Sequence, residues 1–332
     1  MNQQVALESA RHSLRYRASR SFDVDLHSSA LIYESWGQRY DQLSSGQFHG
    51  SVEEVGLPFL SVLRETSNRV ILQKGCAPAG AFAVGVVLNQ DGDAYHRGEI
   101  LRSRAVVTLD PDSAFELRTS EHFDIVAAVF SPAELCAALA GQVPDHRDME
   151  RGLRRLSPAV ECPQADALED FLLRVIEVAR ETPETLRHPT NAMQVAEEFY
   201  GLLNDIIFAG QGAQGRSLCA NRDRVVRRLR AYLDANRGAA VSIADICDQI
   251  GVTRRTLQNT VQEVFGVSPQ TYLKAVRLNG LRRDLKARDP GRESIGDVSA
   301  RWGFWHLSQL AQDYRRLFGE LPSQTPCRRL AA

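Results

Sequence analysis

Arginine is the residue type whose number and placement in this sequence point most directly to a chemistry. The 332 residues include 40 Lys and Arg, of which only Lys74, Lys274 and Lys286 are lysines. A guanidinium donates hydrogen bonds in a planar fork that fits a phosphate group or the edge of guanine. Coding bias explains a preference for Arg over Lys equally well, so the argument depends on where the charges lie.

The charges fall into two segments of opposite sign. Residues 216–332 contain 21 Lys and Arg against 11 Asp and Glu, a balance of +10, whereas residues 1–215 contain 19 against 30, a balance of −11. The formal net charge of −1 is a cancellation, so it does not exclude a polyanionic partner. The basic segment is expected to be attracted to DNA. A further hypothesis is that the acidic segment docks on it when no signal is present; stronger promoter binding by isolated residues 216–332 would support this.

The spacing of His and Cys residues gives little support for metal, redox or nucleophilic chemistry. His96 and Glu99 are three residues apart and His122 follows Glu121, with no His-x-His pair, whereas a cupin-type metal site needs several converging ligands. The sequence contains no Gly-x-Ser-x-Gly motif. Six cysteines lack a Cys-x-x-Cys pair and are expected to be buried thiols, with redox sensing as the alternative: Cys76, Cys136, Cys162, Cys219, Cys247 and Cys327. We therefore assign no catalytic residue, metal or cofactor.

The basic segment contains an internal repeat that determines how its side chains are positioned. The matched residues are Ser242–Ile246, Gly251 and Phe265-Gly266 in the first copy and Ser294–Val298, Gly303 and Phe318-Gly319 in the second. Each copy begins with a Ser-x-x-Asp sequence that caps a helix and places negative charge at its positive end. Each glycine can adopt the positive φ at which the chain reverses sharply. A short helix, a glycine turn and a second helix form a helix-turn-helix motif, whose second helix fits the major groove of DNA.

A third helix is expected to join the two motifs. The motifs span 242–265 and 294–318, with first helices at 243–250 and 295–302 and second helices at 253–265 and 306–318. Between them, the predicted helix 268–288 carries one apolar stripe: Tyr272, Leu273, Val276, Leu281 and Leu285. About 20 residues at ~1.5 Å each give ~30 Å, close to the ~34 Å of one DNA turn. This strut could hold both recognition helices in successive major grooves.

The C-terminal segment resembles the DNA-binding domain of the AraC/XylS family of bacterial transcription regulators. The residues that carry the resemblance are Ile246, Gly251, Leu257, Phe265, Gly266, Pro269, Tyr272, Leu273, Arg277 and Leu278, then Ile295, Val298, Gly303, Phe304, Ser308, Tyr314, Phe318, Gly319 and Pro322. The resemblance implies that a cupin-like domain for effector binding and dimerisation precedes this segment. No ligand-binding residues are assigned in it.

The resemblance also implies which side chains contact DNA. The base-contacting residues would be Arg254, Arg255, Gln258 and Asn259 in the first motif and His306, Leu307, Ser308, Gln309 and Gln312 in the second. Contacts to phosphate would come from Thr253, Arg277, Arg301 and Arg315, although Arg277 could instead tie the strut to the first motif. Arginine suits guanine and Gln or Asn suits adenine. Gln312 stands where the family often has Arg, with Asp313 behind it, so the second helix is expected to make fewer base contacts.

The first part of the chain has a different pattern. Short strands punctuated by turns run from about Leu31 to Ser131, which predicts a β-barrel or sandwich. A helix begins at Ser131-Pro132, and two amphipathic helices follow, at 168–179 and, after a Thr190 cap, at 195–207; their apolar faces pack on the barrel or pair two subunits. The predicted fold class is α+β multidomain, with a cupin-like β domain at 1–145, a helical dimerisation region at 146–209, a Gly-rich linker at 210–219 and the DNA-binding domain at 220–332.

These patterns predict a sequence-specific DNA-binding transcription regulator controlled by an N-terminal sensor domain. The alternative is a cupin-type metalloenzyme or a cysteine-based repair or redox protein that uses the C-terminal domain for DNA targeting. Expected partners are promoter DNA, RNA polymerase, a second copy paired through 165–209 and the sensor domain, and a small-molecule or protein effector. No apolar run approaches the ~18–20 residues of a spanning helix and the N-terminus lacks a signal peptide, which predicts a cytoplasmic protein. Activation or repression depends on where the operator lies.

Overall fold

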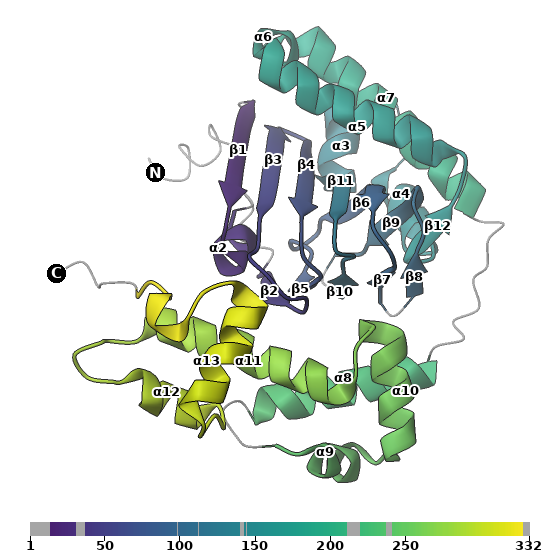
Figure 1. The fold of residues 1–332 in the computed structure, drawn as a ribbon. Helices are drawn as coiled ribbons and strands as arrows, with labels where there is room; N and C mark the ends of the chain where they lie inside the picture. The colour runs from purple at the N-terminus through teal and green to yellow at the C-terminus, as the bar shows by residue number, and fades with distance from the viewer. Residues whose placement is uncertain are drawn as a thin grey trace, which may run out of the picture.

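The chain folds into an N-terminal β domain with attached helices and a C-terminal helical domain that lies against one end of it (Figure 1). The structure is a computed structural model that describes residues 14–30, 37–97, 99–111, 113–139, 143, 145–210, 220–236 and 241–327. The predicted α+β fold class is confirmed. Of the predicted linker, Gly210 is the last residue of a helix, and residues 211–219 lie outside the described residues.

The β domain contains two antiparallel sheets that do not close into a barrel, so it is a sandwich. The strands are β1 (Arg15–Ser21), β2 (Arg39–Gln42), β3 (Gly50–Leu57), β4 (Leu60–Ser67), β5 (Ile71–Cys76), β6 (Phe82–Gln90), β7 (Ala94–His96), β8 (Glu99–Leu101), β9 (Ala105–Leu109), β10 (Ala114–Arg118), β11 (Phe123–Phe130) and β12 (Ala159–Glu161). The larger sheet has the order β1-β3-β4-β11-β6-β9-β12 and the smaller one β2-β5-β10-β7-β8. Apolar side chains of both sheets form one core between them, including Val87, Phe115 and Leu117.

Two strands lie outside the range predicted from the sequence. β1 has the sequence RYRASRS, which lacks an apolar run, yet it pairs along its whole length with β3 at the edge of the larger sheet. β12 is three residues long and pairs with β9. An edge strand pairs on one side only and is partly exposed to solvent, so its residues need not alternate between apolar and polar. The pattern by which a strand is recognised from sequence is therefore weak in β1 and β12.

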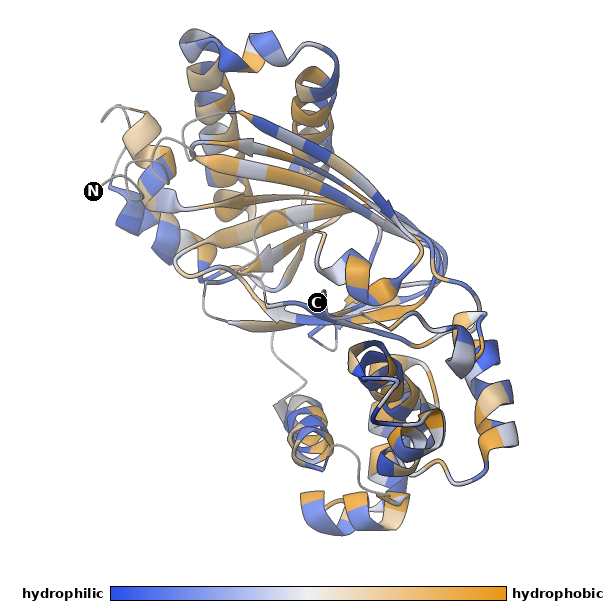
Figure 2. Cartoon of the chain, turned by 90° about the vertical axis from the view of Figure 1, so that its left-hand side faces the viewer, coloured by the Kyte–Doolittle hydropathy of each residue, from blue (hydrophilic) through white to orange (hydrophobic). Residues whose placement is uncertain are grey.

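Five helices of the first half cover the outer face of the larger sheet: α3 (Pro132–Ala138), α4 (His146–Leu153), α5 (Gln164–Glu181), α6 (Pro183–Arg187) and α7 (Pro189–Gly210). The short helix α2 (Val24–Ser28) packs instead beside β2 and β5 of the smaller sheet. Apolar residues, orange in Figure 2, line the sides of α5 and α7 that face the sheet. Phe171 of α5 stacks on Phe199 of α7 with ring centroids 5.7 Å apart. The predicted apolar faces are therefore largely used in packing within the chain.

The predicted cap at Thr190 was wrong. The helix α7 already begins at Pro189, so Thr190 lies inside its first turn. Proline suits the first helical position, since its fixed φ is already helical and its missing N–H would have no partner there. The predicted cap at Ser131 is present: the Glu134 N–H donates to Ser131 Oγ at 3.4 Å.

The C-terminal domain contains both predicted helix-turn-helix motifs and the helix between them. Its helices are α8 (Ala220–Ala235), α9 (Ile243–Ile250), α10 (Arg254–Phe265), α11 (Pro269–Ala287), α12 (Ile295–Arg301), α13 (Leu307–Phe318) and the 3-10 turn η2 (Pro322–Gln324). Capping boxes are present at Ser242 with Asp245 and at Ser294 with Asp297. Gly251 and Gly303 have φ of +68° and +75°, as the glycine turns require.

The strut α11 belongs to two apolar cores. Tyr272, Leu273 and Ala275 near its N-terminus pack with the first motif. Leu278, Leu281 and Leu285 pack with the second motif. Because one continuous helix enters both cores, it couples the positions of the two motifs.

Candidate DNA-binding surface

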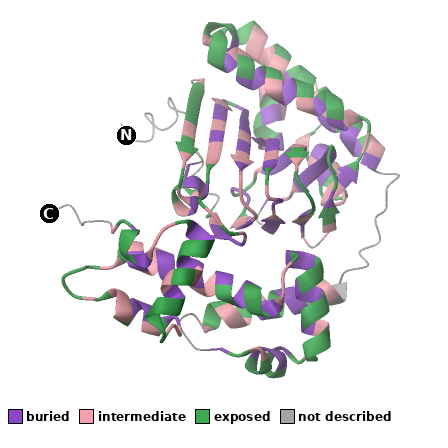
Figure 3. Cartoon of the chain, viewed as in Figure 1, coloured by how far each residue is buried: buried purple, intermediate pink, exposed green. Residues whose placement is uncertain are grey.

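All nine predicted base-contacting side chains are exposed (Figure 3). In α10 they are Arg254, Arg255, Gln258 and Asn259, and at the start of α13 they are His306, Leu307, Ser308, Gln309 and Gln312. On the opposite faces of these helices, Leu257 and Val261 of α10 and Leu310 and Tyr314 of α13 are buried in the two cores. Each second helix thus presents a polar N-terminal half to solvent, which is the geometry that a major-groove reader needs.

The predicted phosphate-contacting residues have different surroundings. Thr253 caps α10, because its Oγ1 accepts a hydrogen bond from the Thr256 N–H at 3.1 Å. The half-buried Arg277 donates through Nη2 to the Val241 carbonyl at 2.6 Å, which favours the alternative that it ties the strut to the first motif. Arg301 is paired with Glu293, and Arg315 is exposed near the end of α13. Phosphate contact by these four residues stays a prediction.

The β domain holds both recognition helices at their C-terminal ends. The Gly46 N–H donates to the carbonyls of Arg316 and Leu317 at 3.0 and 3.1 Å, and Gln42 Nε2 donates to the Leu317 carbonyl at 2.5 Å. These carbonyls belong to the last turn of α13, where no intrahelical donor remains. At the end of α10, Gly266 lies against the guanidinium of Arg118. The polar N-terminal halves of both helices therefore point away from the β domain.

An ionic interface joins the two domains. Lys286 Nζ of α11 lies 2.6 Å from carboxylate oxygens of both Asp23 and Asp25, at the start of α2. Arg282 Nη2 lies 3.1 Å from Asp23 Oδ2, and Arg283 Nη2 donates to the buried Asp41 Oδ1 at 2.8 Å. Acidic residues of the first half thus dock on basic residues of the second, while the predicted base-contacting side chains remain uncovered.

This docking makes interdomain stability dependent on pH. Burial alone would raise the pKa of the Asp23 carboxyl, but the charge of Arg282 and the hydrogen bond and charge of Lys286 outweigh it and hold its pKa at about 2. Since this value is below the ~3.9 of an unfolded Asp, the stabilisation is complete above about pH 4 and is lost as the pH falls toward about 2. The loss amounts to about 3 kcal/mol at most. Urea unfolding of Asp23→Asn is expected to show a shallower decline in stability between about pH 4 and 2 than the wild type, and identical slopes would contradict this.

One arginine of α8, Arg230, is directed toward the β domain. Arg230 is mostly buried and forms an ion pair with Glu116 of β10. Its guanidinium also lies 5.5 Å from the ring centroid of Phe265 at the end of α10. Arg230 therefore links the first motif to the smaller sheet.

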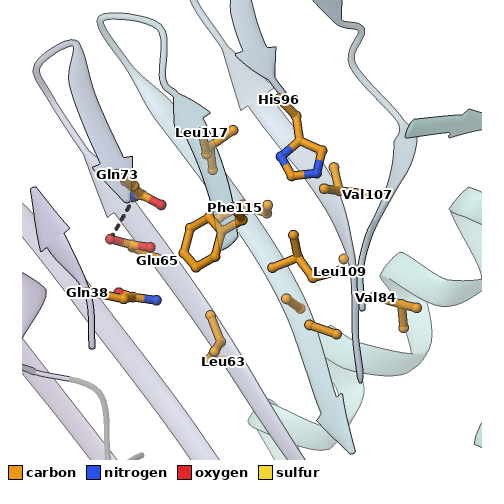
Figure 4. A pocket seen from close by; sticks show the side chains of 14 residues that line it. Gln38, Leu63, Glu65, Gln73, Val84, His96, Val107, Leu109, Phe115 and Leu117 are labelled. Carbon is orange, nitrogen blue, oxygen red and sulfur yellow. Dashed lines mark hydrogen bonds between the residues drawn. The ribbon is translucent and has the colours of Figure 1, made fainter. Parts of the chain in front are cut away.

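The β sandwich contains a small cavity between its two sheets. Its volume is about 70 Å³, and most of its lining is apolar, with Leu63, Phe115 and Leu117 among the residues. Figure 4 shows Glu65 and Gln73 on one side of the cavity and His96 on the other. His96 is 1% exposed, so its ring is buried inside the sandwich. Burial, followed by the charge of Arg97, lowers the pKa of His96 to about 3, so the ring is neutral at pH 7.

Among the described cysteines the prediction of buried thiols holds for Cys247 alone, since Cys136, Cys162 and Cys327 are half-buried and Cys76 is exposed. Burial raises the pKa of the Cys136, Cys162 and Cys247 thiols, whereas cysteine-based chemistry requires a lowered pKa. Cys219 lies outside the described residues. In the part of the chain that the structure describes, no three His, Cys, Asp or Glu side chains are grouped so that they could hold a metal ion. Within the same part, no helix is both long and apolar enough to span a membrane.

Comparisons with known proteins agree with the geometry of the C-terminal domain. A family model described as a helix-turn-helix domain matches residues 246–328. The chain is 34% identical over 100 residues to a probable thc operon regulatory protein of Rhodococcus erythropolis, covering 30% of each chain. It is 24% identical over 139 residues to a XylDLEGF operon transcriptional activator of Pseudomonas putida, covering 42% of this chain and 43% of that one. Among solved structures, the AraC-like transcriptional activator CuxR has 16% identity and a TM-score of 0.38, covering 87% of this chain and 100% of that one.

The two helix-turn-helix motifs and the matching family model define a DNA-binding domain at the C-terminal end of the described chain. This domain is of the AraC/XylS type, as the resemblance predicted. The alignments cover less than half the length of the curated relatives named here.

Proposed function

We propose that this protein is a transcription regulator that binds promoter DNA with α10 and α13 in successive major grooves. The observation that carries the proposal is the exposure of every predicted base-contacting side chain on two helices that share one strut. The balance of +10 in residues 216–332 supplies the attraction to phosphate. The relatives named as activators favour activation, which would involve contact with RNA polymerase in the cytoplasm.

The first half would act as the sensor and dimerisation domain. The cavity between the sheets is the proposed effector site, because its lining is mostly apolar and holds a few polar groups. Dimerisation would use the outer faces of α5 and α7, since their inner faces are occupied by the larger sheet. Phe208 near the end of α7 is 80% exposed, which supports an apolar contact there.

A salt titration tests the DNA-binding proposal. The full chain should bind at least one promoter fragment more tightly than bulk DNA of similar length. The logarithm of the binding constant should fall with the logarithm of the salt concentration, with a slope near 0.9 per neutralised phosphate. Equal affinity for all promoter fragments and bulk DNA would remove the claim of sequence-specific binding.

Arg255→Ala is expected to weaken binding to the preferred fragment by about tenfold or more and to relax the preference at one base pair, because a bidentate contact discriminates by ~1–3 kcal/mol. Arg315→Ala should weaken all sequences alike, because a phosphate contact carries no sequence information. Competition assays with single-base operator variants would separate the two effects. As a control, Arg292→Ala removes an exposed arginine outside both helices, and it should leave sequence preference unchanged.

A further inference from the structure

A buried polar cluster lies between the cavity and the domain interface. Glu65 Oε1 lines the cavity, accepts a hydrogen bond from Gln73 Nε2 at 3.2 Å and lies 3.0 Å from Nε2 of His27. His27 and Tyr40 are each 1% exposed, with ring centroids 5.9 Å apart. Tyr40 donates its hydroxyl hydrogen to Gln38 Oε1 at 2.7 Å, and Gln38 also lines the cavity. The cluster thus connects the cavity to α2 through His27 and to β2 through Tyr40.

The outer sides of the same two elements contact the strut. α2 carries Asp25 and is capped by Asp23, and both carboxylates are paired with Lys286 of α11. β2 carries Gln42, whose N–H donates to Asn279 Oδ1 at 2.9 Å, while Asn279 Nδ2 donates to the Gln42 carbonyl at 2.8 Å. α2 has five residues and β2 has four. Because the interior is close-packed, a displacement of such a short element on its cavity side is transmitted to its other side, where it contacts α11.

We propose that α2 and β2 couple the cavity to the DNA-binding domain: a molecule that takes the Glu65 carboxylate as its hydrogen-bond acceptor releases His27, and the interface between α2 and α11 loosens. This inference rests on the proposed function, since it supplies the regulation of that regulator. In this proposal the domain interface fixes the positions of the two recognition helices. Both recognition helices are held by the β domain at their C-terminal ends, so a tight interface preorganises them for DNA and a loosened one weakens binding.

The lining of the cavity defines the class of molecule. Glu65 offers an acceptor and excludes an anion from its side of the cavity, and the neutral His96 offers one further polar contact. The remaining lining is mostly apolar and the volume is about 70 Å³. A compact, largely apolar molecule with a hydroxyl or amine donor fits this chemistry.

Glu65→Leu in the full chain tests the coupling without a ligand. The leucine keeps the bulk of the side chain and removes the carboxylate that lies 3.0 Å from His27 Nε2. Amide hydrogen exchange of α11, measured without DNA, should become faster, and affinity for the preferred promoter fragment should fall by about fivefold or more. Glu54→Leu is the matched control, because Glu54 is also a buried carboxylate of the larger sheet but lies on β3 and accepts from Ser61. Equal α11 exchange in the two variants would overturn the coupling.

A second variant displaces His27 and leaves Glu65 in place. A Cβ at Gly50 would lie 2.7 Å from both His27 Cε1 and Phe48 Cζ and 2.9 Å from His27 Nδ1, and the Phe48 ring itself packs against His27. Gly50→Ala should therefore also speed exchange in α11, and it serves as the test if Glu65→Leu does not fold. If the Gly50→Ala protein folds and its α11 amides exchange as slowly as those of the wild type, the proposal is contradicted. Failure of the wild type to prefer any promoter would remove the proposed function alone, because exchange is measured without DNA.

Small probes test the assigned ligand chemistry. 1-Propanol and n-propylamine carry a donor on a short apolar chain, whereas propionate has the same length and carries an anion. Either donor probe should speed exchange in α11 of the wild type more than propionate does at the same concentration, and the difference should vanish in Glu65→Leu. Equal exchange with all three probes would contradict the assigned chemistry.

Discussion

Gly280→Ala is expected to destabilise the second helix-turn-helix motif by about 3 kcal/mol, although alanine is the better helix former. A Cβ at Gly280 of α11 would lie 2.1 Å from Cη2 of Trp302, inside the space that the indole ring occupies. Trp302 is 8% exposed, and its Nε1 donates to Asp284 Oδ2 at 2.8 Å, so the ring is held on both sides. The strut must move away from the turn of the second motif, or the indole must leave its pocket.

Urea denaturation followed by circular dichroism would measure this loss. Gly201→Ala is a matched control, because Gly201 also lies inside a helix but has open space around its Cβ position. That substitution should stabilise the protein by roughly 0.5–1 kcal/mol, opposite in sign. Trp302→Leu should make the Gly280→Ala change much less costly, since it removes the clashing ring. Equal effects of Gly280→Ala in the wild-type and Trp302→Leu backgrounds would show that the clash is not the cause.

Arg282→Ala is expected to cost about 3–5 kcal/mol, the range for removing one partner from a buried ion pair. Arg282 is 6% exposed and pairs with Asp23 of the β domain and with Glu320 after α13, each at 3.1 Å. Its guanidinium also lies 5.1 Å from the ring centroid of Phe318. One side chain therefore joins the strut, the second motif and the sensor domain. Without it, two carboxylates lose their main buried cation.

A double-mutant cycle isolates the ion pair. Asp23→Ala in the Arg282→Ala background should cost less than Asp23→Ala alone, because the interaction between Asp23 and Arg282 is already absent there. Arg187→Ala provides the comparison with an exposed pair, since Arg187 contacts Glu184 on the surface of α6, and it should change stability by less than about 1 kcal/mol. Additive effects of Asp23→Ala and Arg282→Ala would contradict a direct interaction.

The parts of the fold that the sequence predicted depend on neighbouring residues. Ser242 and Asp245 are three residues apart, so their capping box can be recognised without knowing the rest of the fold. The glycine turns and the apolar faces of α10 and α13 also depend only on residues close in sequence. Because the motif occurs twice, the same pattern could be recognised in two places. The exposure of Arg254 and Arg255 follows from the same helical periodicity, because the buried Leu257 and Val261 define the opposite face.

The interface between the domains has no local signal. Asp23 and Arg282 are 259 residues apart, and each belongs to a short charged run that is compatible with an exposed surface. The place of Arg230 beside Glu116 and the space that Gly280 leaves for Trp302 are invisible for the same reason. In the β domain, nothing in the spacing of His27, Glu65 and His96 distinguishes these buried residues from surface ones.

The sequence by itself determined that the C-terminal segment forms two capped helix-turn-helix motifs with polar recognition faces, because caps, turns and helical periodicity act over a few residues. Only the tertiary structure decided that the first half is an open sandwich and that its acidic residues dock on α11 while the recognition faces stay exposed. Those outcomes depend on which distant side chains share a buried space, where charges must be paired and volumes must match.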